Sequence, residues 1–477
     1  MKRFLAIYPP GQKFMRGEER CQSNIEDSTS TEIRACNDLG YLAAVMRNNG
    51  WEVELRDFQT EKASETDLFN CLRRFSPDVL FVSVTNATLP KDLALCNRIK
   101  QEQPHLVLIL KGAVFFNPPP EFFTRPDLQC ADYLIAEEAE CVIKALLEAH
   151  FHVRNALKDV PRIFYRENGC WVRSREERHC DELDSLPFPA RDLMRNELYV
   201  RPDTGKPMAT IGVSRGCPSS CTFCMTPPMS GRTIRFRSPE NIVAEMDECV
   251  TRFGITEFFF RADTFTFRRE WTLALCGQIR ARSWGREIHW VANARASTLD
   301  PELLTAMKQA GCWLIAVGFE SGSDETLKKI RKGTTVKMNL QAAQMVHQAK
   351  IKLFGFFMIG FPWETRDHIK ETVKLIHLTR PDFLELHLAT PFYGTELYAQ
   401  IAAQKGALAM PVGCDYFKEV VSCSDYFSAE ELRLLRKKII RGYLFTPAYL
   451  WRRFCEALFS PRIFLGYTRH AWNIIRS

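Results

Sequence analysis

Short apolar segments that alternate with amphipathic segments constrain the fold of this chain most strongly. Before residue 150, five strand-like segments alternate with segments of helical periodicity; they are Arg3–Tyr8, Trp51–Phe58, Asp78–Thr85, Leu106–Lys111 and Asp132–Ala136. This alternation is typical of an α/β fold with a doubly wound parallel sheet, and such sheets bind ligands where their strands end. The expected ligand rim comprises Pro9–Gly11, Asp57–Gln59, Ser83–Asn86 and Lys111–Gly112.

A second run of strands, each followed by a helical pattern, begins near residue 208. Its strands are predicted at Ala209–Val213, Glu257–Arg261, Glu287–Ala292, Trp313–Phe319, Leu353–Ile359 and Phe383–Leu388. Six such units predict a partial (β/α)6 barrel with its chemistry at the carboxyl ends of the strands. We therefore expect a first domain at 1–150, a polar, proline-bearing linker at 151–202, a barrel at 203–405 and a helical C-terminal region at 406–477.

Composition narrows the class of protein. The chain has 477 residues, 46% hydrophobic and 25% charged, which is the balance of a globular protein with a sizeable core. Its most apolar stretches are too short or too interrupted to span a bilayer. The 17 cysteines are odd in number and no secretion signal opens the sequence, so a reduced, cytoplasmic chain with mostly buried thiols is expected.

Three cysteines have the spacing of metal ligands. The segment Cys217-Pro-Ser-Ser-Cys221-Thr-Phe-Cys224 places three thiols in a loop after the first barrel strand. Three soft thiolates suit zinc or an iron–sulfur cluster, although zinc would normally bring a fourth Cys or His at close spacing. A loop with three ligands leaves one iron of a cubane cluster open to an exogenous ligand. Three unrelated structural cysteines are the remaining alternative.

This cysteine motif resembles the signature of the radical S-adenosylmethionine (SAM) enzymes. Four further segments resemble landmarks of one subgroup: Gly318–Leu327, Lys332–Thr335, Phe357–Thr365 and Thr390–Leu397. That subgroup carries an N-terminal cobalamin-binding domain and includes methylases and the anaerobic magnesium-protoporphyrin ester cyclase. The resemblance covers roughly residues 1–405. It implies that Cys217, Cys221 and Cys224 hold a [4Fe-4S] cluster whose open iron chelates the SAM amino and carboxylate groups.

The resemblance also implies a SAM site around the cluster. Phe223 would face the adenine, or else pack on the barrel as a loop aromatic. Asp263 would accept from the SAM amino group and Glu320 would contact its ribose or methionine part; a helix N-cap and a surface acid are the respective alternatives. Arg295 would pair with the SAM carboxylate, or form an ordinary salt bridge. Gly360 would let the backbone approach the adenine closely.

The expected cobalamin motif departs from its usual form in the first domain. The usual Asp-x-His-x-x-Gly reads Asp57-Phe-Gln59-Thr-Glu-Lys62 here, without the His that binds cobalt from below. The double Gly expected after the fourth strand reads Lys111-Gly112. The resemblance implies cobalamin bound without a histidine ligand; the alternative is a domain that has lost its cofactor. The residues assigned to cobalamin are Asp57, Gln59, Ser83, Thr85 and Gly112.

The activity implied by the resemblance is reductive cleavage of SAM, whose 5′-deoxyadenosyl radical takes hydrogen from an unactivated carbon. We expect an oxygen-sensitive, cobalamin-dependent methylase reduced by a one-electron donor such as flavodoxin or ferredoxin. One alternative is a radical cyclase or oxidase with cobalamin as electron carrier. Another is a non-catalytic cobalamin or iron–sulfur sensor, which would have no need of Glu320 or the Gly360–Glu364 segment.

Basic charge is concentrated at the C-terminus. From Leu432 to Ser477 the chain carries a net charge of +9, which leaves −2 for all the other residues, and aromatic residues interleave with the basic ones. Such a segment could lie on an anionic membrane, cap the barrel or bind nucleic acid. We expect no nucleic acid. From this segment we expect a small-molecule or lipid substrate of apolar character, which the protein meets at the inner membrane face.

Overall fold

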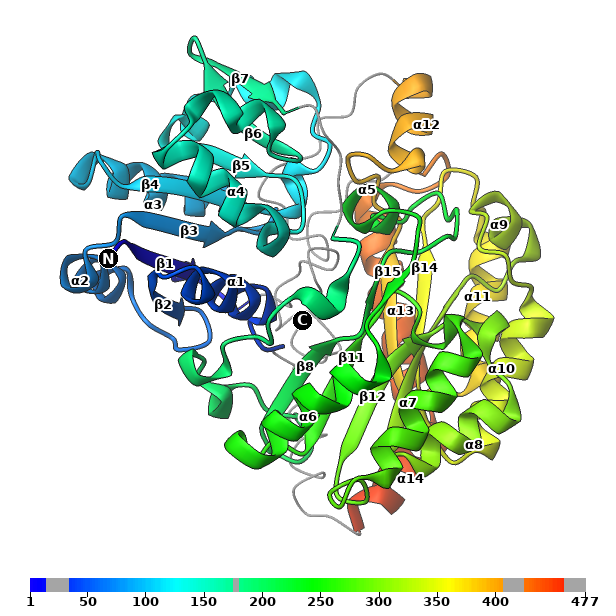
Figure 1. The fold of residues 1–477 in the computed structure, drawn as a ribbon. Helices are drawn as coiled ribbons and strands as arrows, with labels where there is room; N and C mark the ends of the chain where they lie inside the picture. Colours follow the sequence, from blue (N-terminus) through cyan, green and yellow to red (C-terminus); the bar gives the residue numbers. More distant parts are fainter. Residues whose placement is uncertain (14–33, 175–179, 406–423, 459–477) are drawn as a thin grey trace.

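The computed structural model describes residues 1–13, 34–174, 180–405 and 424–458, which form two α/β units lying side by side (Figure 1). Each unit is built on a sheet of parallel strands. In Figure 1 the blue and cyan sheet carries β1 and β3, whose carboxyl ends point towards the green and yellow sheet. The rim at which ligands are expected therefore faces the second unit.

The first sheet has the order β2-β1-β3-β4-β5-β6-β7, and neighbouring strands from β2 to β5 are parallel. These strands are β1 (Arg3–Tyr8), β2 (Glu52–Asp57), β3 (Val79–Ser83), β4 (Val107–Lys111) and β5 (Tyr133–Ile135). Alternate residues of β1 enter opposite cores. Phe4 and Ala6 pack with α1 (Asn37–Asn48) and α4 (Ala139–Phe151), whereas Leu5 and Ile7 pack with α2 (Glu65–Phe75) and α3 (Leu89–Glu102). The doubly wound prediction is confirmed.

The linker predicted at 151–202 needs a correction. Within it, β6 (Ile163–Glu167) and β7 (Cys170–Arg173) form an antiparallel hairpin that extends the first sheet beyond β5. The hairpin turns at Asn168-Gly169, where both residues have positive φ. Ile163 and Phe164 of β6 enter opposite cores, but the other residues of the hairpin are half-buried or exposed, so its sequence lacks the apolar run that marks a buried strand.

The second sheet has six parallel strands in the order β15-β14-β13-β12-β11-β8. They are β8 (Met208–Gly212), β11 (Glu257–Arg261), β12 (His289–Ala294), β13 (Cys312–Glu320), β14 (Lys352–Ile359) and β15 (Phe383–Leu388). All six predicted strands are present. The edge strands β8 and β15 do not pair with each other in the part of the chain that the structure describes, so the sheet is open rather than a closed barrel.

Five helices cover the outer face of the second sheet in Figure 1: α6 (Pro239–Phe253), α7 (Arg269–Ala281), α8 (Pro301–Gln309), α10 (Val336–Gln348) and α11 (Arg366–Thr379). Local sequence sets their ends. Ser238 caps α6 by accepting from the Asn241 backbone N–H, Pro239 occupies its first turn, and Gly254 ends it at φ +63°. Phe258 and Phe260 of β11 point into this helix-covered core, whereas Phe259 faces the inner side.

Two C-terminal helices, α13 (Ala429–Leu444) and α14 (Pro447–Leu458), pack beside β15. Buried Arg436 donates to the Leu386 carbonyl oxygen at 2.6 Å, and buried Arg453 pairs with Asp382 at 2.5 Å. Part of the basic tail therefore covers the edge of the second sheet at β15, whereas the cap alternative places it over the barrel mouth with a solvated basic face. Its last basic residues, Arg462, Arg469 and Arg476, lie outside the described residues. Within the described chain, no helix has both the length and the apolarity needed to cross a membrane.

Candidate active site at the interface of the two sheets

The three-cysteine loop follows β8 and β9 (Ser214–Arg215) and leads into α5 (Thr226–Ser230). Gly216 opens it with φ +87°, and a Cβ there would clash with the Thr233 carbonyl oxygen, so only glycine allows this turn. Backbone hydrogen bonds fix the loop: the Cys217 N–H donates to the Gly231 carbonyl at 3.2 Å, and the Cys224 N–H to the Cys221 carbonyl at 3.2 Å. The loop is therefore held in shape by its own backbone.

None of the three cysteines of the loop belongs to a disulfide that the structure describes. A tetrahedral zinc ion, with Zn–S bonds of about 2.3 Å, would bring its sulfur ligands to about 3.8 Å from one another. Among the described residues, Cys217, Cys221 and Cys224 do not form a group whose ligand atoms all lie within 4.8 Å of one another. At least one pair of these sulfur atoms therefore lies farther apart than the ligands of a single zinc ion, and three thiolates are a donor set that an iron–sulfur cluster accepts. The donor set thus fits the predicted iron–sulfur site better than the zinc alternative.

Two polar residues connect this loop to strand ends of the second sheet. The buried Thr226 donates its backbone N–H to Cys224 Sγ at 3.4 Å, and its hydroxyl donates to Asp263 Oδ1 at 3.4 Å. Asp263 thus lies beside the loop, two residues beyond β11. Arg295, at the end of β12, donates to Cys221 Sγ at 3.7 Å and also to the Lys332 carbonyl. In the described part of the chain Arg295 forms no salt bridge, so that alternative is not supported.

Glu320 ends β13 with φ +63°, an uncommon conformation for a residue with a side chain. It is 7% exposed, and its Oε1 accepts from Lys332 Nζ at 2.6 Å. A Cβ at Gly318 would clash with the Glu320 carboxylate and lie 2.8 Å from Lys332 Nζ, so the glycine makes room for the pair. The surface-acid alternative for Glu320 is therefore wrong. Its role towards SAM stays a prediction, as do those of Asp263 and Arg295.

Phe223 and the segment from Gly360 to Glu364 meet in one apolar cluster. The Phe223 ring is 6.0 Å from that of Phe361, and both belong to a cluster with Leu327 and Ile330. Glu364 Oε2 accepts from the backbone N–H groups of Gly360 at 2.7 Å and Phe361 at 3.1 Å, while burial raises the pKa of Glu364 to about 7. A Cβ on Gly360 would lie 2.9 Å from Leu432 of α13, so this glycine also admits the C-terminal helix.

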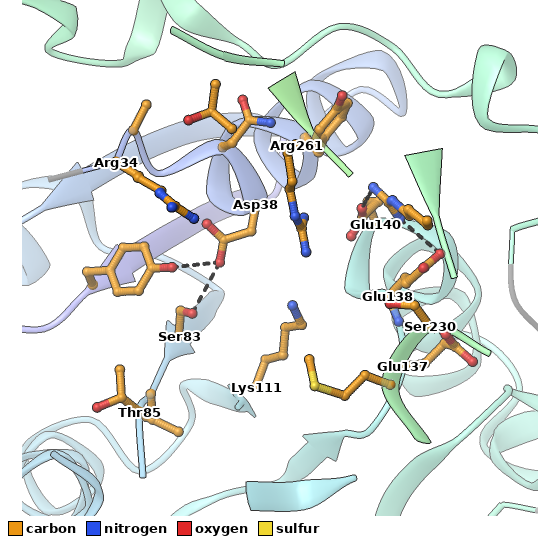
Figure 2. Close-up of a pocket in the computed structure, with 18 of the residues that line it drawn as sticks. Arg34, Asp38, Ser83, Thr85, Lys111, Glu137, Glu138, Glu140, Ser230 and Arg261 are labelled. Atoms are coloured by element: carbon orange, nitrogen blue, oxygen red, sulfur yellow. Dashed lines mark hydrogen bonds and ion pairs between the residues drawn. The ribbon is translucent and has the colours of Figure 1, made fainter. Parts of the chain in front are cut away.

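A cavity lies between the two sheets and encloses about 950 Å³, counting the part open to solvent (Figure 2). The first sheet contributes the strand ends at Tyr8, Ser83, Thr85 and Lys111, and the second contributes residues that include Thr210, Arg215 and Arg261. Ser83 donates to Asp38 Oδ2 at 3.2 Å, and the Tyr8 hydroxyl donates to the same oxygen at 2.9 Å. The predicted rim of the first sheet therefore opens directly onto the second.

Only some of the residues assigned to cobalamin line this cavity. Ser83 and Thr85 line the cavity, but Asp57 and Gln59 are buried and lie outside its lining. Asp57 accepts from the Tyr199 hydroxyl at 2.8 Å and from the Thr60 N–H at 3.1 Å. Gly112 is also outside the lining; a Cβ there would lie 2.6 Å from the Val84 carbonyl oxygen, so it lets two strand ends pack closely. The assignment of these residues to cobalamin stays a prediction.

Several cavity residues were not predicted: Tyr8, Arg34, Asp38, Arg215 and Arg261. The sequence does carry signals for two of them. Tyr8 precedes the rim segment Pro9–Gly11, and Arg261 ends a strand of the second sheet, two residues before Asp263. No local sequence pattern predicts that Arg34 or Asp38 lines the cavity, because these residues reach it only through the packing of α1 beside β1.

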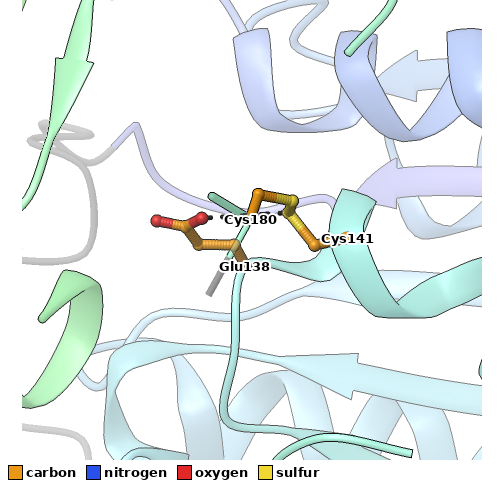
Figure 3. A group of neighbouring side chains, drawn as sticks. All are labelled: Glu138, Cys141 and Cys180. Atoms are coloured by element: carbon orange, nitrogen blue, oxygen red, sulfur yellow. Dashed lines mark hydrogen bonds between the residues drawn. A yellow bond between two sulfur atoms is a disulfide. The ribbon is translucent and has the colours of Figure 1, made fainter. Parts of the chain in front are cut away.

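Buried ion pairs close one side of the cavity. Glu138 pairs with Arg215 at 2.9 Å and with Arg235 at 2.8 Å. Burial alone would raise the pKa of Glu138, but the charges of these two arginines lower it to about 2. Glu138 lies next to Cys141 and Cys180, which form a disulfide (Figure 3). The expected reduced state of the cysteines therefore does not extend to this pair, and the two arginines already pair with the Glu138 carboxylate that a metal ion at this place would need.

Comparison with known proteins identifies both units. Residues 211–376 match the radical SAM superfamily, and residues 38–147 match the B12 binding domain. An uncharacterised methyltransferase of Pyrococcus horikoshii is 29% identical over 409 residues, 85% of this chain and 87% of that protein. The anaerobic magnesium-protoporphyrin IX monomethyl ester cyclase of Cereibacter sphaeroides is 24% identical over 377 residues, 77% of this chain and 60% of the cyclase.

Solved structures share the fold. The radical SAM methyltransferase TsrM of Kitasatospora setae, with cobalamin and a [4Fe-4S] cluster bound, superposes with a TM-score of 0.65 at 16% identity, over 85% of this chain and 75% of TsrM. The cobalamin-dependent radical SAM enzyme OxsB gives a TM-score of 0.66 at 20% identity, over 85% of this chain and 55% of OxsB.

The fold and the three-cysteine site thus define a radical SAM enzyme. With its B12 binding domain, the chain belongs to the cobalamin-dependent radical SAM family. Its cofactors are accordingly a [4Fe-4S] cluster and SAM at the second sheet and cobalamin at the first. The two domains and the relatives support the function of a cobalamin-dependent radical SAM methyltransferase. Cyclases also occur among the relatives.

Proposed function

We propose that this enzyme methylates an unactivated carbon of a substrate bound in the cavity between the two sheets. The observation that carries the proposal is the shared cavity, whose wall joins Ser83 and Lys111 of the B12 domain to Thr210 and Arg261 of the radical SAM domain. When bound, the cluster and SAM supply radical chemistry and cobalamin supplies methyl-group chemistry; the protein supplies position and water exclusion.

The residues around the cluster loop would hold SAM in one orientation. Asp263, tied to the loop through Thr226, offers a carboxylate to the SAM amino group. Phe223, backed by Phe361, offers a ring to the adenine. The buried Glu320–Lys332 pair fixes the carboxylate that would meet the ribose or methionine part. The Arg215–Glu138 pair closes the cavity on the side of α4 and so helps to keep water from the reacting groups.

An apolar substrate body is supported by the inner face of the second sheet. There Phe259, Val291 and Leu314 form a buried cluster, against which Trp313, Phe354 and Phe383 pack in half-buried positions. Except for the indole N–H of Trp313, the side chains of this floor are apolar. We therefore propose a small molecule or lipid with an apolar portion.

Contact with a membrane surface is supported by the outer sides of the two C-terminal helices. Leu450, Trp451 and Phe454 of α14 are 47%, 66% and 51% exposed, and exposed Lys438 and Arg441 lie on α13. Aromatic side chains beside basic ones are typical of proteins that bind anionic membranes peripherally. We propose that the enzyme meets its substrate at the inner membrane face, and that a donor such as flavodoxin or ferredoxin reduces its cluster.

Transfer of a labelled methyl group tests the proposed reaction. The reconstituted, reduced enzyme is supplied with methyl-labelled SAM and with lipid and small-molecule extracts as the source of substrate. A methylase yields 5′-deoxyadenosine together with a labelled product. A cyclase or oxidase, which the cyclase relatives favour as second candidate, yields 5′-deoxyadenosine without label in a product. A sensor yields neither.

A further inference from the structure

The inner face of the second sheet carries side chains at three levels along its strands. At the lowest level Phe259, Val291 and Leu314 form the apolar floor, and Val291 pairs in register with both of the others. At the carboxyl ends of the same three strands, or just beyond them, lie the residues predicted to meet SAM: Asp263, Arg295 and Glu320. A side chain of the middle level therefore lies between the apolar floor and the predicted SAM site.

Asn293 stands at the middle level of β12. It follows Val291 by two residues and precedes Arg295 by two, and the Arg295 guanidinium reaches the cluster loop. Because successive side chains of a strand point to opposite faces, Asn293 shares the inner face with Val291. Ala292 and Ala294, on either side of it, enter the helix-covered core instead. Asn293 is thus the polar side chain that β12 presents between the floor and the cluster loop.

The Asn293 carboxamide has no partner within the part of the chain that the structure describes. It is half-buried and makes no hydrogen bond with another described residue. Its register partner on β13 is Ala316, whose side chain ends at Cβ and offers no polar atom. A carboxamide both donates and accepts, so a bound molecule that covers it without a matching group leaves a polar group buried and unsatisfied. Asn293 therefore favours molecules that carry such a group.

The surroundings of Asn293 favour an uncharged group. The row of paired residues that begins at Asn293 continues across the sheet to Phe354 and Phe383, whose rings lie 6.1 Å apart. At the middle level of β11, Arg261 already has the negative charge of Asp263 nearby. Burial of an ionised group against the rings would be costly, whereas a hydroxyl or amide that bonds Asn293 is compensated. Asn293 also lies outside the lining of the cavity at the strand ends of the first sheet, where cobalamin is expected.

We infer that Asn293 determines substrate specificity: its carboxamide bonds an uncharged hydroxyl or amide group of the substrate, whose apolar body lies on the floor of Phe259, Val291 and Leu314. This inference rests on the proposed function, because it places the substrate between the floor and SAM. It changes the expected substrate from a plain apolar molecule to one that carries an uncharged hydrogen-bonding group beside its apolar body.

Equilibrium dialysis of the anaerobic holoenzyme with SAM tests the inference. The two probes, 2-naphthol and 2-methylnaphthalene, have nearly the same shape and differ by a hydroxyl in place of a methyl group. The quantity measured is the ratio of their affinities, in which the contribution of the shared rings cancels. Asn293→Leu and Asn293→Ala should each lower the preference for 2-naphthol by about 5- to 10-fold relative to the wild-type enzyme, the order expected for the loss of one hydrogen bond.

Val291→Ala is the matched control, because it removes apolar contact from the same face of the same strand. It should weaken the binding of both probes and leave the ratio of their affinities unchanged. A ratio unchanged in both Asn293 variants, or no binding of either probe to the wild-type enzyme, would overturn the inference. Weakened binding of labelled SAM with an unchanged ratio would assign Asn293 to SAM instead.

Transfer of the labelled methyl group is measured separately. Its absence in the wild-type enzyme, with the change in ratio intact in the Asn293 variants, would defeat the proposed reaction and leave the Asn293 site standing.

Discussion

Arg295 donates a hydrogen bond from Nη1 to the Sγ of Cys221 at 3.7 Å, while its Nη2 donates to the Lys332 carbonyl. One guanidinium thus connects a predicted cluster ligand to the segment that follows Glu320. Because Arg295 is permanently charged, it places a positive charge beside a sulfur that carries negative charge when it binds iron.

We predict that Arg295→Gln lowers the midpoint potential of the cluster by on the order of tens of millivolts, because hydrogen bonds and positive charge near the sulfurs favour the reduced state. A redox titration followed by electron paramagnetic resonance measures this shift without reliance on turnover. Arg268→Gln, at an exposed arginine without a sulfur contact among the described residues, is the control. An unchanged potential in Arg295→Gln would contradict the account.

Cobalamin should bind without a histidine on cobalt. Gln59 stands where the usual motif has histidine, and it lies outside the cavity lining, while the carboxylate of Asp57 is held by Tyr199 and Thr60. Electron paramagnetic resonance of the cob(II) form should therefore show no nitrogen superhyperfine splitting from an axial protein ligand. Such a splitting would refute the prediction, and a reconstituted protein that bound no cobalamin at all would do so equally.

The buried carboxyl of Glu364 should make stability depend on pH. Burial raises its pKa from 4.5 to about 7, so between these pH values the folded state binds more protons than the unfolded state. The free energy of unfolding that this group contributes is therefore present below about pH 4.5 and is lost as the pH rises to about 7.

Glu364→Gln removes the titration and keeps an amide oxygen for the backbone N–H groups of Gly360 and Phe361. Compared with the wild-type protein, this variant should gain stability steadily from pH 4.5 to 7, by roughly 3 kcal/mol in all. Urea unfolding at a series of pH values measures the difference. A constant difference across that range would show that the carboxyl of Glu364 does not titrate there.

The proposed membrane contact should depend on exposed aromatic residues of α14. In flotation with anionic liposomes, Trp451→Ala combined with Phe454→Ala should reduce binding several-fold, because these two side chains are exposed and stack on each other at the surface. Phe267→Ala removes an exposed aromatic from the other side of the second sheet and should have no effect. Equal flotation of all three proteins, or binding that neutral lipid supports as well, would refute the contact.

Sequence alone predicts most strands of the two sheets, but only some of the residues that line the candidate site. The strands Glu257–Arg261 and Phe383–Leu388 have the predicted bounds, because apolar runs ended by turn residues mark parallel strands clearly. The hairpin of β6 and β7 was missed because half-exposed edge strands carry no such run. The metal site is predicted from cysteine spacing, a purely local signal. Lys111 and Arg261 come together only through the packing of the two sheets, which no local pattern encodes.

Cleavage of SAM by the three-cysteine site is the most direct test of the whole account. After anaerobic reconstitution, the wild-type protein should hold about four irons per chain at this site and release 5′-deoxyadenosine from SAM when reduced. Cys217→Ala, Cys221→Ala and Cys224→Ala should each abolish that release, whereas Cys312→Ala, at a buried cysteine of the core, should not. Release of 5′-deoxyadenosine by the triple alanine variant at the wild-type rate would contradict the account.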